Sequence, residues 1–395
     1  MSERSVALGG PVFTRAFKVL AALFVLGCAL ILWRLVAGLG ATTAMNDGEP
    51  WGIWIAFDVV TGTALACGGY AMAILVYVLN RGKYHPLVRS AILTSALGYT
   101  MAGVSITLDV GRPWLIWKVP TYFWSWNFHS ALLEVALCVM SYIFVLWIEL
   151  SPAFFEKFAE GPEGGLKRFS KKILPVLDKS LIWIIALGML LPTMHQSSLG
   201  SLVMLLSQKV YPLWQTPFLP LLFLTSCIAM GYAAVVFEST LSSLFFRRPR
   251  ETAMLAGLGK AMLPILLFFL VLRFGDLAYH GKLPLLFVPN RFTFLFWIET
   301  VLFALPLVLL SSDGLRRNAA NLFRAAMSLM LAGGLYRFDA YLIAYRPGED
   351  VHYFPSAQET LITLGLVALE ILVYITFVKL FPILSGAPRR ATAQA

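Results

Sequence analysis

Cysteine is scarce in this chain of 395 residues, which contains only 4. The cysteines stand singly within apolar segments, without the close pairs or triplets that hold iron–sulfur clusters. A buried single cysteine behaves as a small apolar side chain. We therefore expect core thiols, and no iron–sulfur cluster in this chain, at Cys28, Cys67, Cys138 and Cys227.

Histidine is also scarce, with 5 residues, and its placement disfavours haem. A transmembrane b-type cytochrome needs paired axial imidazoles that face each other across a bundle. The sequence predicts no histidine at mid-helix, and it contains no cluster typical of a metal site, so we expect neither haem nor another metal. The predicted positions are a loop for His85, helix ends or beyond for His129, His280 and His352, and the end of the fifth apolar segment for His195.

Charged residues make up only 13% of the chain, whereas hydrophobic residues make up 59%. Soluble globular domains contain about 25% charged residues, so this composition predicts a polytopic membrane protein. In a soluble chain the net charge of +10 would suggest nucleic acid as a partner. Here the basic residues stand in short loops between apolar segments, which indicates orientation in a membrane rather than nucleic-acid binding.

Ten segments reach the roughly 20 apolar residues that are needed to cross a bilayer. Each must be helical, because lipid offers no hydrogen bonds to the backbone. We therefore expect an all-α protein, a single membrane domain over residues 1–395 with no other part long enough to fold alone, so that any catalytic domain must come from other subunits. The predicted spans are 17–37, 53–79, 88–108, 127–149, 174–194, 218–245, 254–274, 292–312, 321–341 and 358–383.

Lysine and arginine are concentrated in every second connection, beginning with the N-terminal segment and ending with the C-terminal tail. Because basic loops stay in the cytoplasm, both termini are predicted to be cytoplasmic, in a bacterial inner membrane. The first span, preceded by Arg15 and Lys18, could instead be a cleaved secretory signal. Its apolar run exceeds the usual signal core of about 7–15 residues, so we expect it to be retained.

The connections on the two faces differ in character. The outer ones at 109–126, 273–292 and 337–357 are rich in Trp, Tyr, Phe and Pro. Such rings belong either to the interfacial aromatic belt or to a docking surface for an outer partner protein. The longest inner connection, 150–172, carries mixed charge and is expected to be a loop that separates two packed halves.

Three carboxylates stand inside otherwise apolar segments: Asp58, Glu134 and Glu238. A charged side chain at the bilayer centre costs roughly 2.5–3.5 kcal/mol, so these residues suggest proton handling. The alternative for each is local pairing with an arginine or a backbone group. Glu299 and Glu370 are also predicted within the membrane, but the sequence shows no polar residue at matching depth beside them.

Helical rise, about 1.5 Å per residue, assigns a depth to each acid. Asp58 falls about 10 Å below the outer edge, Glu134 about 15 Å below it near the midplane, and Glu238 near the cytoplasmic end. Tyr99 also lies near mid-depth, and its hydroxyl can pass a proton. We therefore predict a proton path from Glu238 through Glu134 and Tyr99 towards Asp58.

Three segments carry a family resemblance: GEPWGIWIAFDVVTGTALACGGY, TLDVGRPWLIWKVPTYFWSWNFHSALLEVAL and LPTMHQSSLGSL. They resemble NrfD-like membrane subunits of the polysulfide-reductase type, in particular those of hydrogenase-2-type uptake Ni-Fe hydrogenases. The resemblance covers most of the chain, and LDVGRPW is its most specific element. It implies two four-helix bundles, at 53–194 and 218–341, with one flanking helix at each end, at 17–37 and 358–383.

The resemblance also implies a haem-free subunit that binds a quinone, menaquinone or ubiquinone, near the outer face. Other branches of the family have histidine where this chain has Asp58, so direct contact between Asp58 and the quinone stays open. His195 is alternatively a capping or loop residue. Carried onto this sequence, the pocket would be lined or bordered by Asp58, Trp54, Tyr122, His129 and His195, under a loop fixed by a hydrogen bond between Asp109 and Arg112.

The resemblance finally implies partners on the periplasmic side: the large and small subunits of a Ni-Fe hydrogenase and an Fe-S subunit that passes electrons to the quinone. Proton uptake through Glu238, Tyr99 and Glu134 would then separate charge. Two other classes remain open from the residues alone. One is a secondary transporter, with helices broken at Pro192, Pro264 or Pro306, and the other is a purely structural anchor for exported redox subunits.

Overall fold

The computed structural model describes residues 5–49, 51–348 and 351–385. Every long element in these ranges is a helix, which confirms the all-α prediction. The second span is a run of short helical segments, η1 (Trp54–Thr61), α3 (Gly62–Leu65), α4 (Gly68–Ala73) and η2 (Ile74–Val78). The other long helices are α1 (Arg15–Ala37), α5 (Val88–Asp109), α7 (Ala131–Ala159), α8 (Gly165–Leu205), α9 (Leu219–Phe245), α10 (Thr252–Tyr279), α11 (Arg291–Leu309), α13 (Ala319–Phe338) and α14 (Ala357–Leu380).

Nine helical segments of the described chain are long and apolar enough to cross a membrane, and they correspond to nine of the ten predicted spans. The remaining prediction, 321–341, forms α13 and the π-helical turn η8 (Asp339–Ile343). This segment is outside the set of nine, and it contains Arg324, Arg337 and Asp339. It packs on α9 and α11, so protein rather than lipid surrounds much of it.

Side-chain caps fix the starts of several helices. Ser130 Oγ accepts a hydrogen bond from the Leu133 amide at 3.3 Å, and Ser356 forms a capping box with Glu359. Such caps satisfy amide groups that have no partner within the helix. Most predicted starts agree within a few residues, but α7 begins at Ala131 rather than at 127.

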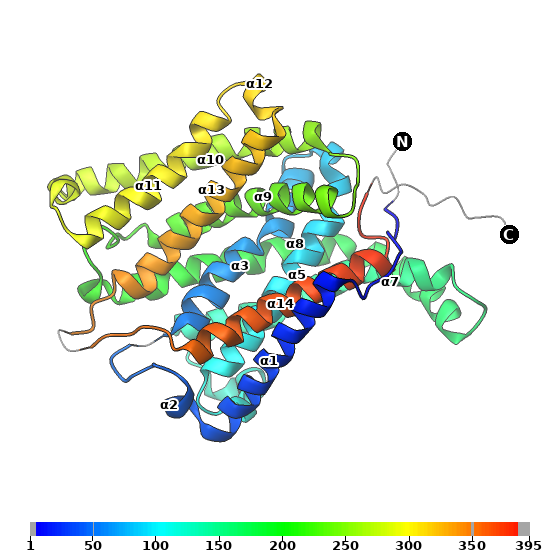
Figure 1. The fold of residues 1–395 in the computed structure, drawn as a ribbon, viewed down its shortest axis with the longest axis horizontal. Coiled ribbons are helices and arrows are strands. Elements are labelled where there is room, and N and C mark those ends of the chain that lie inside the picture. Colours follow the sequence, from blue (N-terminus) through cyan, green and yellow to red (C-terminus); the bar gives the residue numbers. More distant parts are fainter. Residues whose placement is uncertain (1–4, 50, 349–350, 386–395) are drawn as a thin grey trace.

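The connection predicted at 150–172 is wrong in length. Helix α7 continues to Ala159 and α8 begins at Gly165, so only residues 160–164 separate them. The two helices pack against each other as an antiparallel hairpin, and Figure 1 shows its green tip extending beyond the other helices. The polar residues in this stretch belong to helix ends that extend beyond the apolar core of each span.

The first and last described residues lie on one face of the molecule, which we call the terminal face, and we call the opposite face the distal face. Val6 pairs with Leu384 in an isolated bridge, and Figure 1 shows the blue and red ends of the ribbon beside each other. Helices α1 and α14 run side by side, and a Cβ built on Gly27 would lie 3.0 Å from the Cα of Gly365. Glycine at both positions permits this approach, as is common between membrane helices.

The centre of the protein is formed by α9 and the second span. Helix α9 packs on α3, α4 and α8 on one side and on α10 and α13 on the other. Small residues allow these contacts, because a Cβ on Gly231 would lie 2.5 Å from the Cys67 carbonyl oxygen. Helix α1, by contrast, exposes apolar side chains such as Val36 and Val19, as expected for a helix that faces lipid. The division into two bundles at 53–194 and 218–341 stays a prediction.

Candidate functional site

Asp58 lies near the distal face at the junction of three helices. Its Oδ2 atom accepts hydrogen bonds from Ser105 Oγ at 3.1 Å and from Thr363 Oγ1 at 3.0 Å. Ser105 stands close to the end of α5, and Thr363 lies near the start of α14. The Asp58 side chain is half-buried, so it is fixed in position yet still reachable.

Trp54 lies one turn before Asp58 and is fully buried. Its indole Nε1 donates to the backbone oxygen of Glu359 at 3.3 Å, and its ring packs on Leu108 and Ile362. The structure therefore brings the predicted Trp54 and Asp58 together, with Trp54 forming a rigid apolar wall beside the carboxylate.

Glu359 organises the chain around this site. Its Oε2 accepts from the Ala44 amide at 2.9 Å, and its Oε1 accepts from the Tyr353 hydroxyl at 2.7 Å. The Tyr353 hydroxyl also accepts from the Ile53 amide at 2.8 Å. Burial, and then the hydrogen bond to Glu359, raise the pKa of Tyr353, so its hydroxyl stays protonated as a permanent donor. These bonds hold Ala44 and Ile53 at the distal end of the site.

Tyr122 and His129 lie on the connection between α5 and α7, and both are exposed. The Tyr122 ring is 4.9 Å from the Trp124 ring, and the Lys118 ammonium lies over it at 5.3 Å. This connection also exposes large apolar side chains on the distal side of the protein. They are Trp114, Trp117, Phe123, Trp124 and Phe128.

The predicted hydrogen bond between Asp109 and Arg112 is not formed. Arg112 is exposed, whereas Asp109 Oδ1 is buried and makes no hydrogen bond in the described chain. The buried cation at this position is Arg34 of α1, which interacts electrostatically with Asp109 and donates to the Val110 carbonyl at 2.6 Å. An arginine distant in the sequence thus supplies the contact, because α1 packs beside the end of α5.

Tyr99 and His195 form the second part of the candidate site. Both are fully buried, and Tyr99 OH lies 3.3 Å from His195 Nδ1. His195 Nε2 is buried without a hydrogen-bond partner in the described residues. The expectation that His195 ends its helix is wrong, because α8 continues for ten residues to Leu205. The pair therefore lies about 15 Å inside the distal ends of α5 and α8.

Arg337 extends this pair into a longer polar chain. Its Nη2 donates to Gln196 Oε1 at 3.2 Å and to the Phe223 carbonyl at 2.8 Å, and its Nη1 donates to Ser226 Oγ at 3.0 Å. Gln196 in turn donates to Thr63 Oγ1 at 3.0 Å. Side chains from the second span, α8, α9 and α13 are thus joined inside the protein. The sequence analysis missed Arg337 and Gln196, although a polar residue in an apolar helix is the available signal for both.

Glu134 does not lie near the midplane as predicted. It stands in the first turn of α7, with its amide bonded to the Ser130 carbonyl, close to the distal end of that helix. Tyr99 instead contacts Tyr142, whose ring centroid is 4.5 Å away. Tyr142 follows Glu134 by eight residues, or about 12 Å of helix, so Glu134 and Tyr99 are separated in depth.

Glu238 lies towards the terminal end of α9, seven residues before Phe245. The Tyr374 hydroxyl donates to its Oε1, while its Oε2 is buried without a partner in the described residues. Ser242, one turn further on α9, accepts from Arg248 at 3.0 Å, and Arg248 lies 3.4 Å from Glu251. The terminal face therefore carries a polar group of residues that leads to Glu238.

Polar residues line one face of α14 between Glu238 and Asp58. Thr363, Glu370 and Tyr374 are seven and four residues apart, which places them on the same side of a helix. Thr363 bonds Asp58, Tyr374 bonds Glu238, and Glu370 Oε1 faces α5, 3.6 Å from where a Cβ on Gly98 would stand. Glu370, which the sequence left without polar neighbours, thus lies between the two predicted acids.

Glu299 also has polar neighbours that the sequence did not predict. It forms a buried ion pair with Arg273 of α10, and it lies within reach of Asp339 and Trp214. These residues come from four separate segments of the chain, so their meeting could not be seen from helical depth alone.

Four of the five histidines, His85, His129, His280 and His352, are exposed and stand outside or at the ends of the long helices. His195 is the one fully buried member, and its ring contacts Tyr99 and Gln196. Within the described ranges no group of three or more histidine, cysteine or acidic residues could hold a metal ion. The arrangement offers hydrogen-bond donors and titratable groups, which suit proton transfer and binding of a carbonyl-containing ligand.

These features define an integral membrane protein whose helices enclose connected polar side chains. The family model described as "Polysulphide reductase, NrfD" matches residues 41–344. The chain therefore belongs to the NrfD family, as the sequence resemblance indicated.

Named relatives support this assignment. The chain is 43% identical over 389 residues to the "Probable Ni/Fe-hydrogenase 2 b-type cytochrome subunit" of Escherichia coli strain K12, covering 97% of this chain and 96% of that relative. It is 27% identical over 249 residues to the "Menaquinone reductase, integral membrane subunit" of Nitratidesulfovibrio vulgaris, covering 61% and 57%. It is 23% identical over 386 residues to the "Hdr-like menaquinol oxidoreductase integral membrane subunit" of Archaeoglobus fulgidus, covering 89% and 88%.

Proposed function

We propose that this protein is the haem-free, quinone-binding membrane subunit of a Ni-Fe hydrogenase complex that faces the periplasm. The observation that carries the proposal is its 43% identity, over nearly the whole of both chains, to a relative named as a hydrogenase 2 subunit. Two further relatives are named after menaquinone or menaquinol. The distal face corresponds to the predicted periplasmic side, and both termini lie in the cytoplasm.

The residues around Asp58 fit a quinone. A quinone supplies a lipid-soluble carrier that takes up electrons together with protons. The half-buried Asp58 carboxyl can donate a hydrogen bond when protonated, and Trp54 offers a flat apolar wall beside it. Deeper in the protein, His195 Nε2 is a buried polar atom that has no hydrogen-bond partner among the described residues. Tyr122 and His129 are exposed on the connection between α5 and α7, and in this proposal they border the site.

The exposed aromatic loop between α5 and α7 supports a protein partner at the distal face. Its tryptophan and phenylalanine side chains form a group of apolar residues of the kind that partner proteins cover. We propose that an Fe-S subunit docks there and brings electrons from the large and small hydrogenase subunits to the quinone.

Proton delivery in this proposal follows α14 rather than the route through Glu134. Protons enter from the terminal face at Glu238, pass by the Tyr374 hydroxyl to Glu370, and reach Asp58. Helical rise puts Glu370 about 6 Å from Tyr374 and about 10 Å from Thr363 along the helix, so water must bridge the second interval. Tyr99 and His195 then lie outside this proton route, and they hold the inner end of the site in place.

The histidine positions support a subunit without haem, although one relative is named a b-type cytochrome subunit. A second axial imidazole opposite His195 would have to come from a helix, yet the other four histidines stand outside or at the ends of the long helices. The neighbours of His195 are instead a tyrosine and a glutamine.

The test is Asp58→Asn in the whole complex, assayed in two ways. Hydrogen oxidation with a soluble dye reports on the partner subunits, and hydrogen oxidation with quinone reports on this one. Asparagine keeps an acceptor for Ser105 and Thr363 but cannot titrate, so only the quinone-linked rate should fall, by about 10²-fold or more. The control is Asp47→Asn, which changes an exposed acid in the preceding loop. Full quinone-linked activity in Asp58→Asn would reject the Asp58 site.

A further inference from the structure

A second acidic cluster lies between α10, α11 and the end of α13, apart from the Asp58 site. Its centre is Arg273, which pairs with Glu299 and stacks on two rings, 4.1 Å from Phe296 and 4.9 Å from Tyr336. Asp276 lies nearly one turn after Arg273 on α10, and Asp339 of η8 faces Glu299. All the charged members are at least 95% buried.

The cluster holds polar atoms that make no hydrogen bond in the described chain. Both carboxylate oxygens of Asp339 are among them. Three donors also lack a partner: Trp214 Nε1, Tyr336 OH and Arg273 Nη1. Trp214, Tyr336 and Arg273 line, together with Asp276, a small cavity of about 10 Å³. A space of this size with several polar walls suits one water molecule.

Charge balance indicates that the cluster holds a proton. The Arg273 guanidinium pairs with Glu299 and lies near Asp339, whereas Asp276 lies 3.1 Å from His280 Nδ1. Arg337, two residues before Asp339, is directed to Gln196 and Phe223 instead. With both Glu299 and Asp339 ionised, one buried negative charge would be uncompensated and would cost several kcal/mol, so one of these two carboxyls is neutral. The guanidinium also makes a metal cation an unsuitable occupant.

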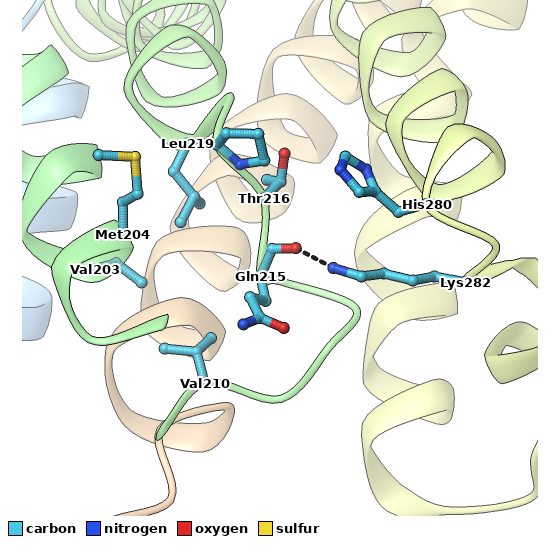
Figure 2. Close-up of a pocket in the computed structure, with 9 residues that line it drawn as sticks. Val203, Met204, Val210, Gln215, Thr216, Leu219, His280 and Lys282 are labelled. Atoms are coloured by element: carbon cyan, nitrogen blue, oxygen red, sulfur yellow. Dashed lines mark hydrogen bonds between the residues drawn. The ribbon is translucent and has the colours of Figure 1, made fainter. Parts of the chain in front are cut away.

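A larger cavity of about 420 Å³ adjoins this cluster on the side of the distal face. It lies among the ends of α8 and α10 and the start of α9, and Figure 2 shows His280 and Lys282 opposite Thr216 and Gln215. Thr216 lines both cavities. His280 Nδ1 lies 3.1 Å from Asp276 Oδ1, so this pair spans the wall between them. The Lys282 ammonium is held aside by a 2.5 Å hydrogen bond to the Gln215 carbonyl.

We propose that Glu299 and Asp339 form a proton-binding site that exchanges protons with the aqueous phase at the distal face. The proton passes from the larger cavity to the His280–Asp276 pair, then through the small cavity to Glu299 and Asp339. The groups that face the site are Arg273, Asp276 and His280 from α10 and its end, Tyr336 from α13, and Trp214 from the segment before α9. This site is separate from the quinone proposal, because Asp58 bonds Ser105 and Thr363, and no hydrogen bond or ion pair among the described residues joins the cluster to Asp58 or α14.

Infrared spectroscopy of the purified full-length chain tests the proposal without any quinone or partner. The carbonyl stretch of a protonated carboxyl shifts in deuterium oxide, so its exchange can be timed. The wild-type protein should show a band that is lost in both Asp339→Asn and Glu299→Gln. The control Asp313→Asn changes an exposed acid near the terminal end of α13 and should retain the band.

A second experiment tests the route and leaves the acidic cluster unchanged. Thr216→Cys is made in a Cys28→Ser background, and the new cysteine is labelled with a bulky thiol reagent. The other native thiols, Cys67, Cys138 and Cys227, are buried. The reagent should slow exchange of the band by about tenfold, because it closes the boundary between the cavities. The control is Thr121→Cys on the exposed distal loop. A band unaffected by Asp339→Asn and Glu299→Gln, or exchange unchanged by the reagent at position 216, would overturn the proposal.

Discussion

Arg337 Nη2 lies 3.2 Å from Gln196 Oε1, and this contact joins α13 to α8 in the interior of the protein. Gln196 follows His195 directly, so the guanidinium is one residue away from the Tyr99–His195 pair. Arg337 also bonds Ser226 and the Phe223 carbonyl of α9. A single buried cation thus positions groups from both predicted halves of the chain.

Arg337→Lys tests whether the planar guanidinium is required. A lysine carries the same charge but cannot reach Gln196, Ser226 and Phe223 together, so buried acceptors lose their donors. We expect a loss of about 1–3 kcal/mol in stability, measured as a lower thermal midpoint of the purified protein in detergent. Arg346→Lys, on an exposed arginine at the distal face, should leave the midpoint unchanged. Equal midpoints for Arg337→Lys and the wild type would show that the contact is dispensable.

Glu370→Gln tests the route along α14. Glutamine preserves the size and polarity of the side chain but cannot carry a proton between Tyr374 and Asp58. In the complex, we expect quinone-linked hydrogen oxidation to fall by about 10²-fold while dye-linked oxidation is retained. Glu134→Gln is the matched comparison on α7, and it should have the smaller effect, because Glu134 lies outside the α14 route. The reverse order of effects would restore the path first predicted through Glu134.

Helix number and type could be read from the sequence because lipid leaves the backbone no other structure. Runs of about 20 apolar residues therefore located nine spans closely. The errors fall where a helix leaves the apolar layer. Residues 150–172 are polar enough to suggest a loop, yet α7 and α8 continue through most of them, since helices remain favourable in water when they pack as a pair.

The candidate site was predicted in part. Rise per residue gives the position of a residue along its helix, but Glu134 lies in the first turn of α7 rather than deep in its span, and the membrane depths of Asp58, Tyr99 and Glu238 stay predictions. Rise per residue gives no information on which helix faces meet. The partner of Asp109 was therefore assigned to the nearby Arg112, whereas the fold brings Arg34 from α1. For the same reason the sequence predicts no polar neighbour for Glu370, since its neighbours lie on α5 and at distant points of α14.

The close approach of α1 and α14 gives a prediction on packing. A Cβ at position 365 would lie 2.9 Å from the Gly27 Cα, so Gly365→Val must force the helices apart. Overpacking of this kind costs about 1–3 kcal/mol, and we expect a lower thermal midpoint in detergent. Gly40→Ala is the control, because nothing lies within 4 Å of its Cβ position. A midpoint equal to that of the wild type would mean that α1 is free to shift without cost.

Glu49, in the distal loop before η1, gives a prediction on pH. Its side chain is buried, Oε2 has no hydrogen-bond partner in the described chain, and burial raises its pKa above the usual 4.5. The folded state therefore holds this proton more tightly than the unfolded chain, so stability from this group is present below pH 4.5 and is lost as pH rises through the raised pKa.

Glu49→Gln removes this titration and keeps the shape of the side chain. The thermal midpoint of the variant, relative to the wild type, should therefore increase from acidic to neutral pH. Asp47→Asn, two residues earlier and exposed, provides the matched control and should show no such increase. Taking the difference between variant and wild type at each pH cancels the other acids, which titrate alike in both proteins. A difference that stays constant or shrinks towards neutral pH would show that the Glu49 carboxyl does not resist ionisation in the folded protein.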